Sequence, residues 1–432
     1  MKGSYFQLFL KGCSFSVVAL GCMGVLNYLI RRYQVFHLSE YEYGLFYSIL
    51  ALVSLTGSFA EFGLTQAGTV LIAEASLQPE RKERLSSCFS GLLGFKFTTS
   101  MVLFLILLVF NVPIREHYLK GVPFLFYLTG IALLLAQMAD SAFKALWNGT
   151  KNYFLQNAIS IVQAALLFGL VLCLTDRYSV QGSLLAFLAA PVLISSSALL
   201  AARKKLGIRL RLPERGGLKR LLCLSGLVGI GTTLLNMTYQ LNVAMLTLLK
   251  GVEASADYNI ALPIMQIMQL SMVIPFIFLP IAVQMVREKE YKAIGRYQLS
   301  ATLVTLGAVP VAFLVFREIS PFLVRLLFSG KYEFVAPTVT VLCSGQLLFT
   351  YGSFLMQIMI AMDGARVTAV IAAVTFLINV ILNFLLIGQF GIQGAAWSTF
   401  FAYLFFAAAM NRMLRLRIRK EQRNPMEMSA GS

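Results

Sequence analysis

Long apolar runs recur along the whole chain, and they constrain its fold more than any other feature. Twelve can be counted, at about 12–30, 44–72, 88–111, 122–147, 154–174, 182–202, 221–249, 258–286, 298–316, 334–362, 367–387 and 394–411. Most approach or exceed the roughly 20 residues that a helix needs to cross a bilayer. Only 13% of the 432 residues are charged, about half of what a soluble domain carries. The sequence therefore predicts an all-α integral membrane protein and leaves no room for a large soluble catalytic domain.

The basic residues between these runs are distributed unequally, and this asymmetry predicts the orientation of the chain. When the N-terminus is placed in the cytoplasm, the loops on that side hold 25 Lys and Arg residues and the opposite loops hold 9. The first run is followed by Arg31-Arg32 and not by a small-residue cleavage site, so we expect a membrane helix instead of a cleaved signal peptide. Because cytoplasmic loops carry the excess of Lys and Arg, both termini are predicted to be cytoplasmic.

The formal net charge of +17 also indicates which partners to expect. The basic residues lie between hydrophobic runs, which favours contact with anionic lipid headgroups over nucleic acid. The six cysteines lack C-x-x-C spacing, and His37 and His117 are the only histidines. The sequence therefore predicts no metal site and no cofactor.

An internal repeat predicts that the chain is duplicated. Three pairs of segments match at an offset of 215 or, with a small gap, 212: Glu42-Tyr43-Gly44-Leu45 with Asp257-Tyr258-Asn259-Ile260, Asn148-Gly149 with Asp363-Gly364, and Val180-Gln181-Gly182 with Ile392-Gln393-Gly394. Their common order and spacing indicate two copies of a six-helix unit. Because six is an even number, both copies would have the same orientation in the membrane.

We therefore expect two pseudo-symmetric six-helix bundles around a central cavity. The expected boundaries are 1–202 for the N-terminal bundle, 203–220 for a basic cytoplasmic linker, 221–413 for the C-terminal bundle and 414–432 for a basic cytoplasmic tail. Two such bundles are typical of an alternating-access carrier more than of a channel.

Ionisable residues inside the runs of the first half are candidate site residues. Glu61, Lys96 and Asp140 lie at a similar depth, roughly 10–16 Å from the cytoplasmic ends of their helices. An ionisable group in a membrane span costs at least ~2.5 kcal/mol, so we interpret Glu61 and Asp140 as coupling or cavity acids and Lys96 and Lys144 as substrate-binding cations. The alternative is that Asp140 and Lys144, four residues apart, neutralise each other, while both lysines extend to the cytoplasmic interface.

The runs of the second half carry amides in place of charges. Asn236 and Gln240 lie in the seventh run, and Gln346 and Gln357 lie in the tenth run on one helical face with Thr350 and Ser353. We interpret the four amides as candidates for binding a hydroxyl-rich substrate. Hydrogen bonding between helices is the alternative for such amides in a membrane protein.

The first quarter of the chain carries a family pattern. Arg31-Arg32 closes the first run, Glu42-Tyr43-Gly44-Leu45-Phe46 opens the second, and Glu61-Phe62-Gly63-Leu64 leads to Ile72-Ala73-Glu74. This pattern resembles the polysaccharide and O-antigen (Wzx-type) flippases of the multidrug/oligosaccharidyl-lipid/polysaccharide exporter superfamily.

The resemblance implies a transporter and not an enzyme. Its substrate would be a lipid-pyrophosphate-linked oligosaccharide, an O-antigen or other surface polysaccharide repeat unit, moved from the inner to the outer leaflet of a bacterial cytoplasmic (inner) membrane. The resemblance adds Arg31 and Arg32 to the substrate-binding candidates and carries over Glu61. Membrane lipids and other polysaccharide assembly proteins are further candidate partners, and both H+ and Na+ stay open as the coupling ion.

Three alternatives compete with this interpretation. A cation-coupled multidrug or small-solute exporter of the same superfamily would need a buried acid in the first run, which has none. A carrier of the major facilitator type also has six plus six helices, but its glycine-rich charged motif is absent from 73–86. A membrane polymerase or ligase usually depends on a large outer loop, and the longest outer loop expected here is about 318–333.

Overall fold

The chain is helical throughout the part that the structure describes, and the predicted all-α membrane architecture is confirmed. The computed structural model describes residues 2–77, 81–210, 215–328 and 330–430, and it contains no strand in these ranges. Residues 211–214 of the expected linker and 431–432 of the expected tail lie outside the described residues. The chain forms two compact units, Met1–Thr233 with Gly251–Ala256 and Leu234–Lys250 with Asp257–Ser432.

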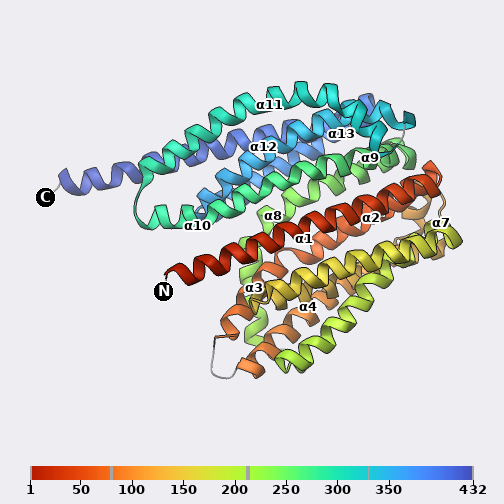
Figure 1. Cartoon of the computed structure of the whole chain (residues 1–432), viewed down its shortest axis with the longest axis horizontal. Helices are drawn as coiled ribbons and strands as arrows, with labels where there is room; N and C mark the ends of the chain where they lie inside the picture. Colours follow the sequence, from red (N-terminus) through yellow and green to blue (C-terminus); the bar gives the residue numbers. More distant parts are fainter. Residues whose placement is uncertain (1, 78–80, 211–214, 329, 431–432) are drawn as a thin grey trace. The chain divides into compact units, whose positions relative to one another are not determined.

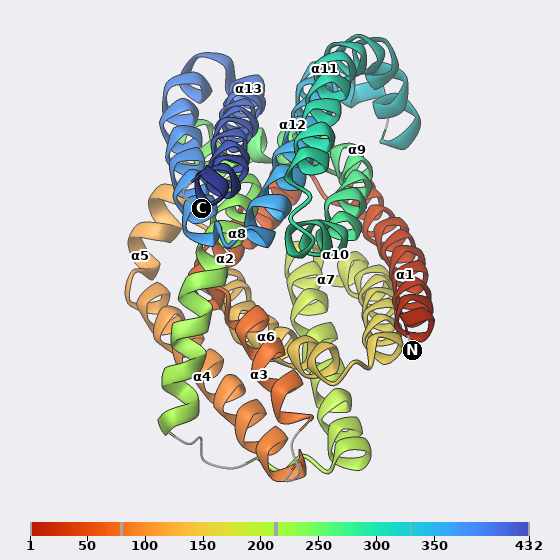
Figure 2. The ribbon, with the colours of Figure 1, turned by 90° about the vertical axis from the view of Figure 1, so that its left-hand side faces the viewer.

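The first unit is an assembly of long helices around an apolar core. Its elements are α1 (Lys2–His37), α2 (Glu40–Glu61), α3 (Leu64–Ala75), α4 (Arg81–Val109), α5 (Asn111–Pro113), η1 (Ile114–Tyr118), α6 (Phe124–Gly149), α7 (Tyr153–Leu206), and the first parts of α8 (Arg215–Lys250) and α9 (Val252–Met268). α1 packs along α7, whereas α3, α4 and α6 pack together (Figure 1; Figure 2). The fully buried Trp147 lies in the apolar core where α3, α4 and α6 meet.

The second unit has a long, buried helix among its neighbours. It contains the remaining parts of α8 and α9, followed by η2 (Gln269–Met272), α10 (Val273–Arg287), α11 (Tyr291–Leu327), η3 (Gly330–Val335), α12 (Ala336–Ala361) and α13 (Ala365–Ala430). α12 packs against α10, α11 and α13, and most of its side chains are buried. The membrane-domain boundaries expected from the sequence stay a prediction.

Two of the helices are hairpins of two membrane-length arms. α7 has 54 residues and α13 has 66, whereas one crossing takes roughly 20. The backbone leaves the helical conformation at Ser179 in α7 (φ 50°, ψ −129°) and at Gly391 in α13 (φ 56°, ψ −129°). Each reversal directly precedes one of the segments that the internal repeat aligns, Val180-Gln181-Gly182 and Ile392-Gln393-Gly394, so the repeated sequence folds into the same local structure in each unit.

Two glycines just after these reversals permit a very close backbone contact. A Cβ atom added to Gly182 would lie 2.0 Å from the carbonyl oxygen of Leu174, and one added to Gly394 would lie 2.3 Å from that of Leu386. Residues eight positions apart in a continuous α-helix are separated by about 12 Å along its axis. The chain therefore reverses sharply at both points.

Seven helices in the described residues are long and apolar enough to cross a membrane. If each arm of α7 and α13 is counted separately, and α2–α3 and α9–α10 are counted as interrupted spans, the described residues give twelve helical segments. These correspond to the twelve apolar runs of the sequence.

Two of the runs are interrupted in the structure, and the second of them, 258–286, contains the prolines Pro263, Pro275 and Pro280, which favour a bent helix. The run 44–72 is broken between α2 and α3, where Phe62 and Gly63 have φ angles of 26° and 77°. The run 258–286 is broken by η2, after which α10 begins with Pro275 in its first turn. Proline is tolerated there because the first amides of a helix have no intrahelical acceptor.

Candidate functional site

The break between α2 and α3 places the Glu61 carboxylate at the start of a helix. Glu61 is the last residue of α2, and its Oε1 accepts a hydrogen bond of 2.8 Å from the backbone amide of Thr65 in the first turn of α3. A carboxylate is favoured at this position because the first amides of a helix lack intrahelical partners and carry partial positive charge. Gly63 is required here: a Cβ on it would lie 2.4 Å from the Cα of Gly229.

Lys96 of α4 completes a buried ion pair with Glu61. Its Nζ lies 2.5 Å from Glu61 Oε2, 2.7 Å from Thr65 Oγ1 and 2.7 Å from Ser141 Oγ. An ammonium group has three donors, and each of them has an acceptor here. The Lys96 side chain is 0% exposed and that of Glu61 is 23% exposed. The pair is therefore fully hydrogen-bonded, and the carboxylate is its accessible end.

A second ion pair lies on α6, where Asp140 directly precedes Ser141, one of the three acceptors of Lys96. Asp140 and Lys144 are one turn apart on α6, and Lys144 Nζ lies 2.7 Å from Asp140 Oδ2. The Lys144 side chain is 42% exposed, whereas that of Asp140 is 13% exposed. Glu61, Lys96, Asp140 and Lys144, which we call the charged belt, thus contain two acids and two bases in paired contacts. Lys144 is the cation of the belt that an anion could reach most directly.

The structure separates the two interpretations of these charges. Asp140 and Lys144 pair with each other, as in the structural alternative. Extension of Lys96 to the interface is wrong, because its ammonium is buried between three helices. The roles of the belt in binding or coupling stay predictions.

Arg31 and Arg32 lie at a different level of the first unit. The Arg31 guanidinium lies 4.7 Å from the centre of the Tyr47 ring, and Arg32 lies 3.4 Å from the Tyr28 hydroxyl. Tyr47 and Glu61 are both on α2, and fourteen residues of helix correspond to about 21 Å. The structure therefore does not bring the arginines and the charged belt into one site.

The amides of the second unit are mostly packed between helices. Gln346 and Gln357 of α12 are buried, and Gln346 Oε1 accepts a 2.7 Å hydrogen bond from the Tyr239 hydroxyl of α8. The amide nitrogen of Gln346 has no hydrogen-bond partner among the described residues. On α8, Asn236 is exposed and Gln240 is half-buried. Binding of a hydroxyl-rich substrate by these amides stays a prediction.

Comparison with known proteins assigns the chain to a family. The sequence profile of the family described as polysaccharide biosynthesis protein matches residues 9–286. The chain belongs to this family. An uncharacterized membrane protein of Methanocaldococcus jannaschii is 25% identical over 422 residues, covering 93% of this chain and 82% of that protein.

Solved structures place this family member in the fold of one transporter superfamily. An inward-facing multidrug resistance MATE family transporter of the MOP superfamily has a TM-score of 0.72 at 13% identity, covering 94% of this chain and 99% of the other. The lipid II flippase MurJ in an inward closed conformation also has a TM-score of 0.72, at 14% identity, covering 98% and 91%. These likenesses show the fold. The protein is thus a multi-pass membrane protein of the polysaccharide biosynthesis protein family, and its fold is that of these transporters.

The second unit contains a polar network that sequence reasoning recognises only in part. Asn242 donates hydrogen bonds to Tyr258 (2.8 Å) and Thr399 (2.6 Å), and Asn383 donates to Asn242 (2.7 Å) and Asn379 (3.1 Å). All five residues are buried, and they link α8, α9 and both arms of α13. Asn379 and Asn383 are recognisable as an i, i+4 amide pair, but the partners from other helices come from distant sequence.

Proposed function

We propose that this protein is a transporter that moves a lipid-pyrophosphate-linked oligosaccharide from the inner to the outer leaflet of a bacterial cytoplasmic membrane by alternating access around a central cavity. An O-antigen or other surface polysaccharide repeat unit is the proposed substrate, and both termini are proposed to be cytoplasmic. The family, polysaccharide biosynthesis protein, supports a sugar-containing substrate. The name of a structural neighbour, lipid II flippase MurJ, supports a lipid-linked one.

The single observation that carries the proposal is the charged belt inside three membrane helices. Charges in a span are costly, and a pyrophosphate headgroup needs cations to replace its hydration. Lys144, at 42% exposure, would make the first contact. The three donors of Lys96 are already occupied, so Lys96 would bind a phosphate only when Glu61 gives up its share of them.

This competition provides a route to coupling. Protonation of Glu61, or its replacement by a substrate phosphate, would release Lys96 to the anion, so that substrate and H+ act on the same pair. If the cell interior is negative, outward movement of a negative charge also gains ~2.3 kcal/mol per 100 mV. Na+ stays open as an alternative coupling ion.

Reconstituted flipping tests the function directly. Proteoliposomes would contain a lipid-pyrophosphate-linked oligosaccharide with a fluorescent sugar, and a membrane-impermeant quencher would report which leaflet holds it. We expect the transporter to move the label between leaflets, and Lys144→Leu to slow this movement by at least tenfold. Lys292→Leu is the matched control, because it removes an exposed cation of α11 outside the belt. Normal flipping by Lys144→Leu would contradict the headgroup role of the belt.

A multidrug exporter is the competing function, since the MATE neighbour has the same TM-score as MurJ. The same proteoliposomes, loaded with a cationic dye, would distinguish the two. Dye export with no flipping would overturn the proposal. We expect flipping without dye export, because α1 contains no acidic residue to hold a cation in the first helix.

The orientation has a separate test. In a cysteine-free background, an impermeant thiol reagent added to intact cells should label Glu318→Cys, whose native side chain is 82% exposed. The same reagent should not label Lys204→Cys, in the exposed basic end of α7. Labelling of Lys204→Cys from outside would invert the proposed topology.

A further inference from the structure

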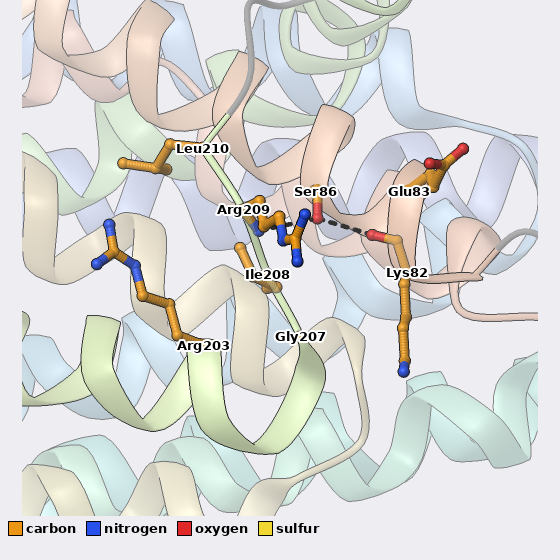
Figure 3. A pocket seen from close by; sticks show the side chains of 8 residues that line it. All are labelled: Lys82, Glu83, Ser86, Arg203, Gly207, Ile208, Arg209 and Leu210. Carbon is orange, nitrogen blue, oxygen red and sulfur yellow. Dashed lines mark hydrogen bonds between the residues drawn. The ribbon is translucent and has the colours of Figure 1, made fainter.

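A basic pocket lies where α4 begins and α7 ends. It has a volume of about 680 Å³, within the range of pockets that hold small ligands. Figure 3 shows the residues that line it: Lys82, Glu83, Ser86, Arg203, Gly207, Ile208, Arg209 and Leu210. None of the substrate candidates of the charged belt is among them, so this is a separate site.

The local sequence fixes the wall of the basic pocket. α7 ends at Leu206, and Gly207 adopts a left-handed conformation with φ 68°. The chain then runs along α4, where the Arg209 amide donates a 3.1 Å hydrogen bond to Ser86 Oγ. Ser86 in turn donates a 2.7 Å hydrogen bond to the Lys82 carbonyl (Figure 3). The segment after α7 is therefore attached to the first turns of α4.

The basic pocket has an excess of positive charge among the described residues that line it. Lys82, Arg203 and Arg209 are exposed, and none of them forms an ion pair with another described residue. The one carboxylate of the lining, Glu83, lies on the opposite side from Arg203 (Figure 3). In this described lining, three cations face one acid, which leaves a net charge of +2. An anion is the ligand that such a pocket fits.

Apolar side chains in the same lining indicate an amphipathic anion. Ile208 is buried, whereas Leu210 is 48% exposed, so a hydrocarbon surface adjoins the cations. The pocket lies at the ends of two helices that are long and apolar enough to cross a membrane, and the ends of such helices lie near the lipid headgroups. Basic pockets between helices at this depth are typical binding sites for anionic headgroups.

We propose that the basic pocket binds the phosphate group of an anionic membrane phospholipid, with Lys82, Arg203 and Arg209 as the phosphate ligands and Leu210 beside the acyl chains. This inference does not depend on the proposed transport function. A bound lipid would fix the start of α4 to the end of α7, and it would make the stability of the first unit depend on the lipid composition of the membrane.

Lipid binding to the purified full chain tests the proposal. The probes are phosphatidylglycerol and phosphatidylcholine with identical acyl chains, added to the protein in detergent, and the readouts are the affinity and the thermal midpoint. We expect phosphatidylglycerol to bind and to raise the midpoint, and phosphatidylcholine to do neither. Arg203→Ala with Arg209→Ala should weaken phosphatidylglycerol binding about 25-fold, since each basic group contributes a factor of about five.

Matched variants and a second anion make the result decisive. Lys204→Ala with Lys205→Ala removes the same charge from adjacent exposed positions outside the pocket, and it should weaken binding less than twofold. Equal weakening in both double variants would overturn the proposal in favour of diffuse attraction. Competition by inorganic pyrophosphate or by a polyprenyl pyrophosphate at concentrations that match phosphatidylglycerol would also overturn it, and would assign the pocket to a phosphate of another source. If the Ala variant unfolds, Arg203→Gln with Arg209→Gln gives the same comparison.

Discussion

The ion pair between Glu61 and Lys96 makes an asymmetric prediction about stability. Glu61→Leu leaves the Lys96 ammonium buried, at 0% exposure, with two hydroxyl acceptors and no carboxylate hydrogen-bonded to it. Lys96→Leu leaves a carboxylate that is 23% exposed and still accepts a hydrogen bond from the Thr65 amide. Glu61→Leu should therefore be the more damaging substitution, although both remove the same pair.

The magnitudes follow from the contacts. Removal of one partner of a buried ion pair costs about 3–5 kcal/mol, and we assign the upper part of this range to Glu61→Leu. The double variant Glu61→Leu with Lys96→Leu removes both charges. It should be more stable than Glu61→Leu alone, because well-packed apolar side chains replace a buried ion pair at little or no cost. The expected coupling between the two positions is at least about 2 kcal/mol.

A thermal unfolding series in detergent checks this cycle. Since 1 kcal/mol corresponds to roughly 2–4 °C for a unit of this size, the roughly 4–5 kcal/mol assigned to Glu61→Leu should lower the midpoint by roughly 8–20 °C. Lys144→Leu is the control, because its ion pair is partly exposed and should contribute no more than about 1 kcal/mol. Unchanged midpoints in both Glu61→Leu and Lys96→Leu would refute the buried pair. A double variant that regains stability and also flips substrate normally would leave the pair a structural role alone.

Three further substitutions test other parts of the first unit. Arg31→Lys should change stability by no more than about 1 kcal/mol, the contribution of its contact with the Tyr47 ring. It should nevertheless reduce export, because lysine lacks the bidentate fork that holds a phosphate. A normal level of surface polysaccharide in this variant would make Arg31 a membrane anchor. Gly182→Ala should lower the unfolding free energy by about 3 kcal/mol or more, because its Cβ would meet a backbone carbonyl. Gly169 has open space around it, so Gly169→Ala should leave the thermal midpoint unchanged. Ser179→Gly should be more stable than Ser179→Ala by about 1–3 kcal/mol, since only glycine relieves the strained backbone; equal midpoints would contradict that strain.

The apolar runs were sufficient to predict the helical segments, but not where the helices break. Phe62-Gly63 lies inside an apolar run with no proline, and the break there depends on the approach of Gly63 to Gly229, which are far apart in the sequence. The reversals in α7 and α13 had a clearer signal, since the repeated segments Val180-Gln181-Gly182 and Ile392-Gln393-Gly394 directly follow them. A glycine that follows a short polar segment in both copies of a repeat indicates a backbone constraint.

The charged belt was visible as separate ionisable residues, and its pairing was only partly predictable. Asp140 and Lys144 are four residues apart on one helix, so their contact follows from helical geometry. Glu61 and Lys96 are 35 residues apart, and no local rule joins them. Burial of Lys96 also depends on Ser141, whose hydroxyl is an unremarkable feature of the sequence.

A comparison of the two copies of the repeat separates what the fold requires from what is particular to one copy. The turns Asn148-Gly149 and Asp363-Gly364 align at an offset of 215, and the same offset places Leu355 and Met359 opposite Asp140 and Lys144. Both of these residues are buried in the apolar core of the second unit, at 0% and 2% exposure. The six-helix repeat can thus be built with apolar side chains at these positions. The backbone reversal is present in both copies, whereas these charges are present in one copy. Their cost in a membrane helix is therefore not one that the repeat itself requires, and it is the proposed handling of an anionic substrate that would account for it.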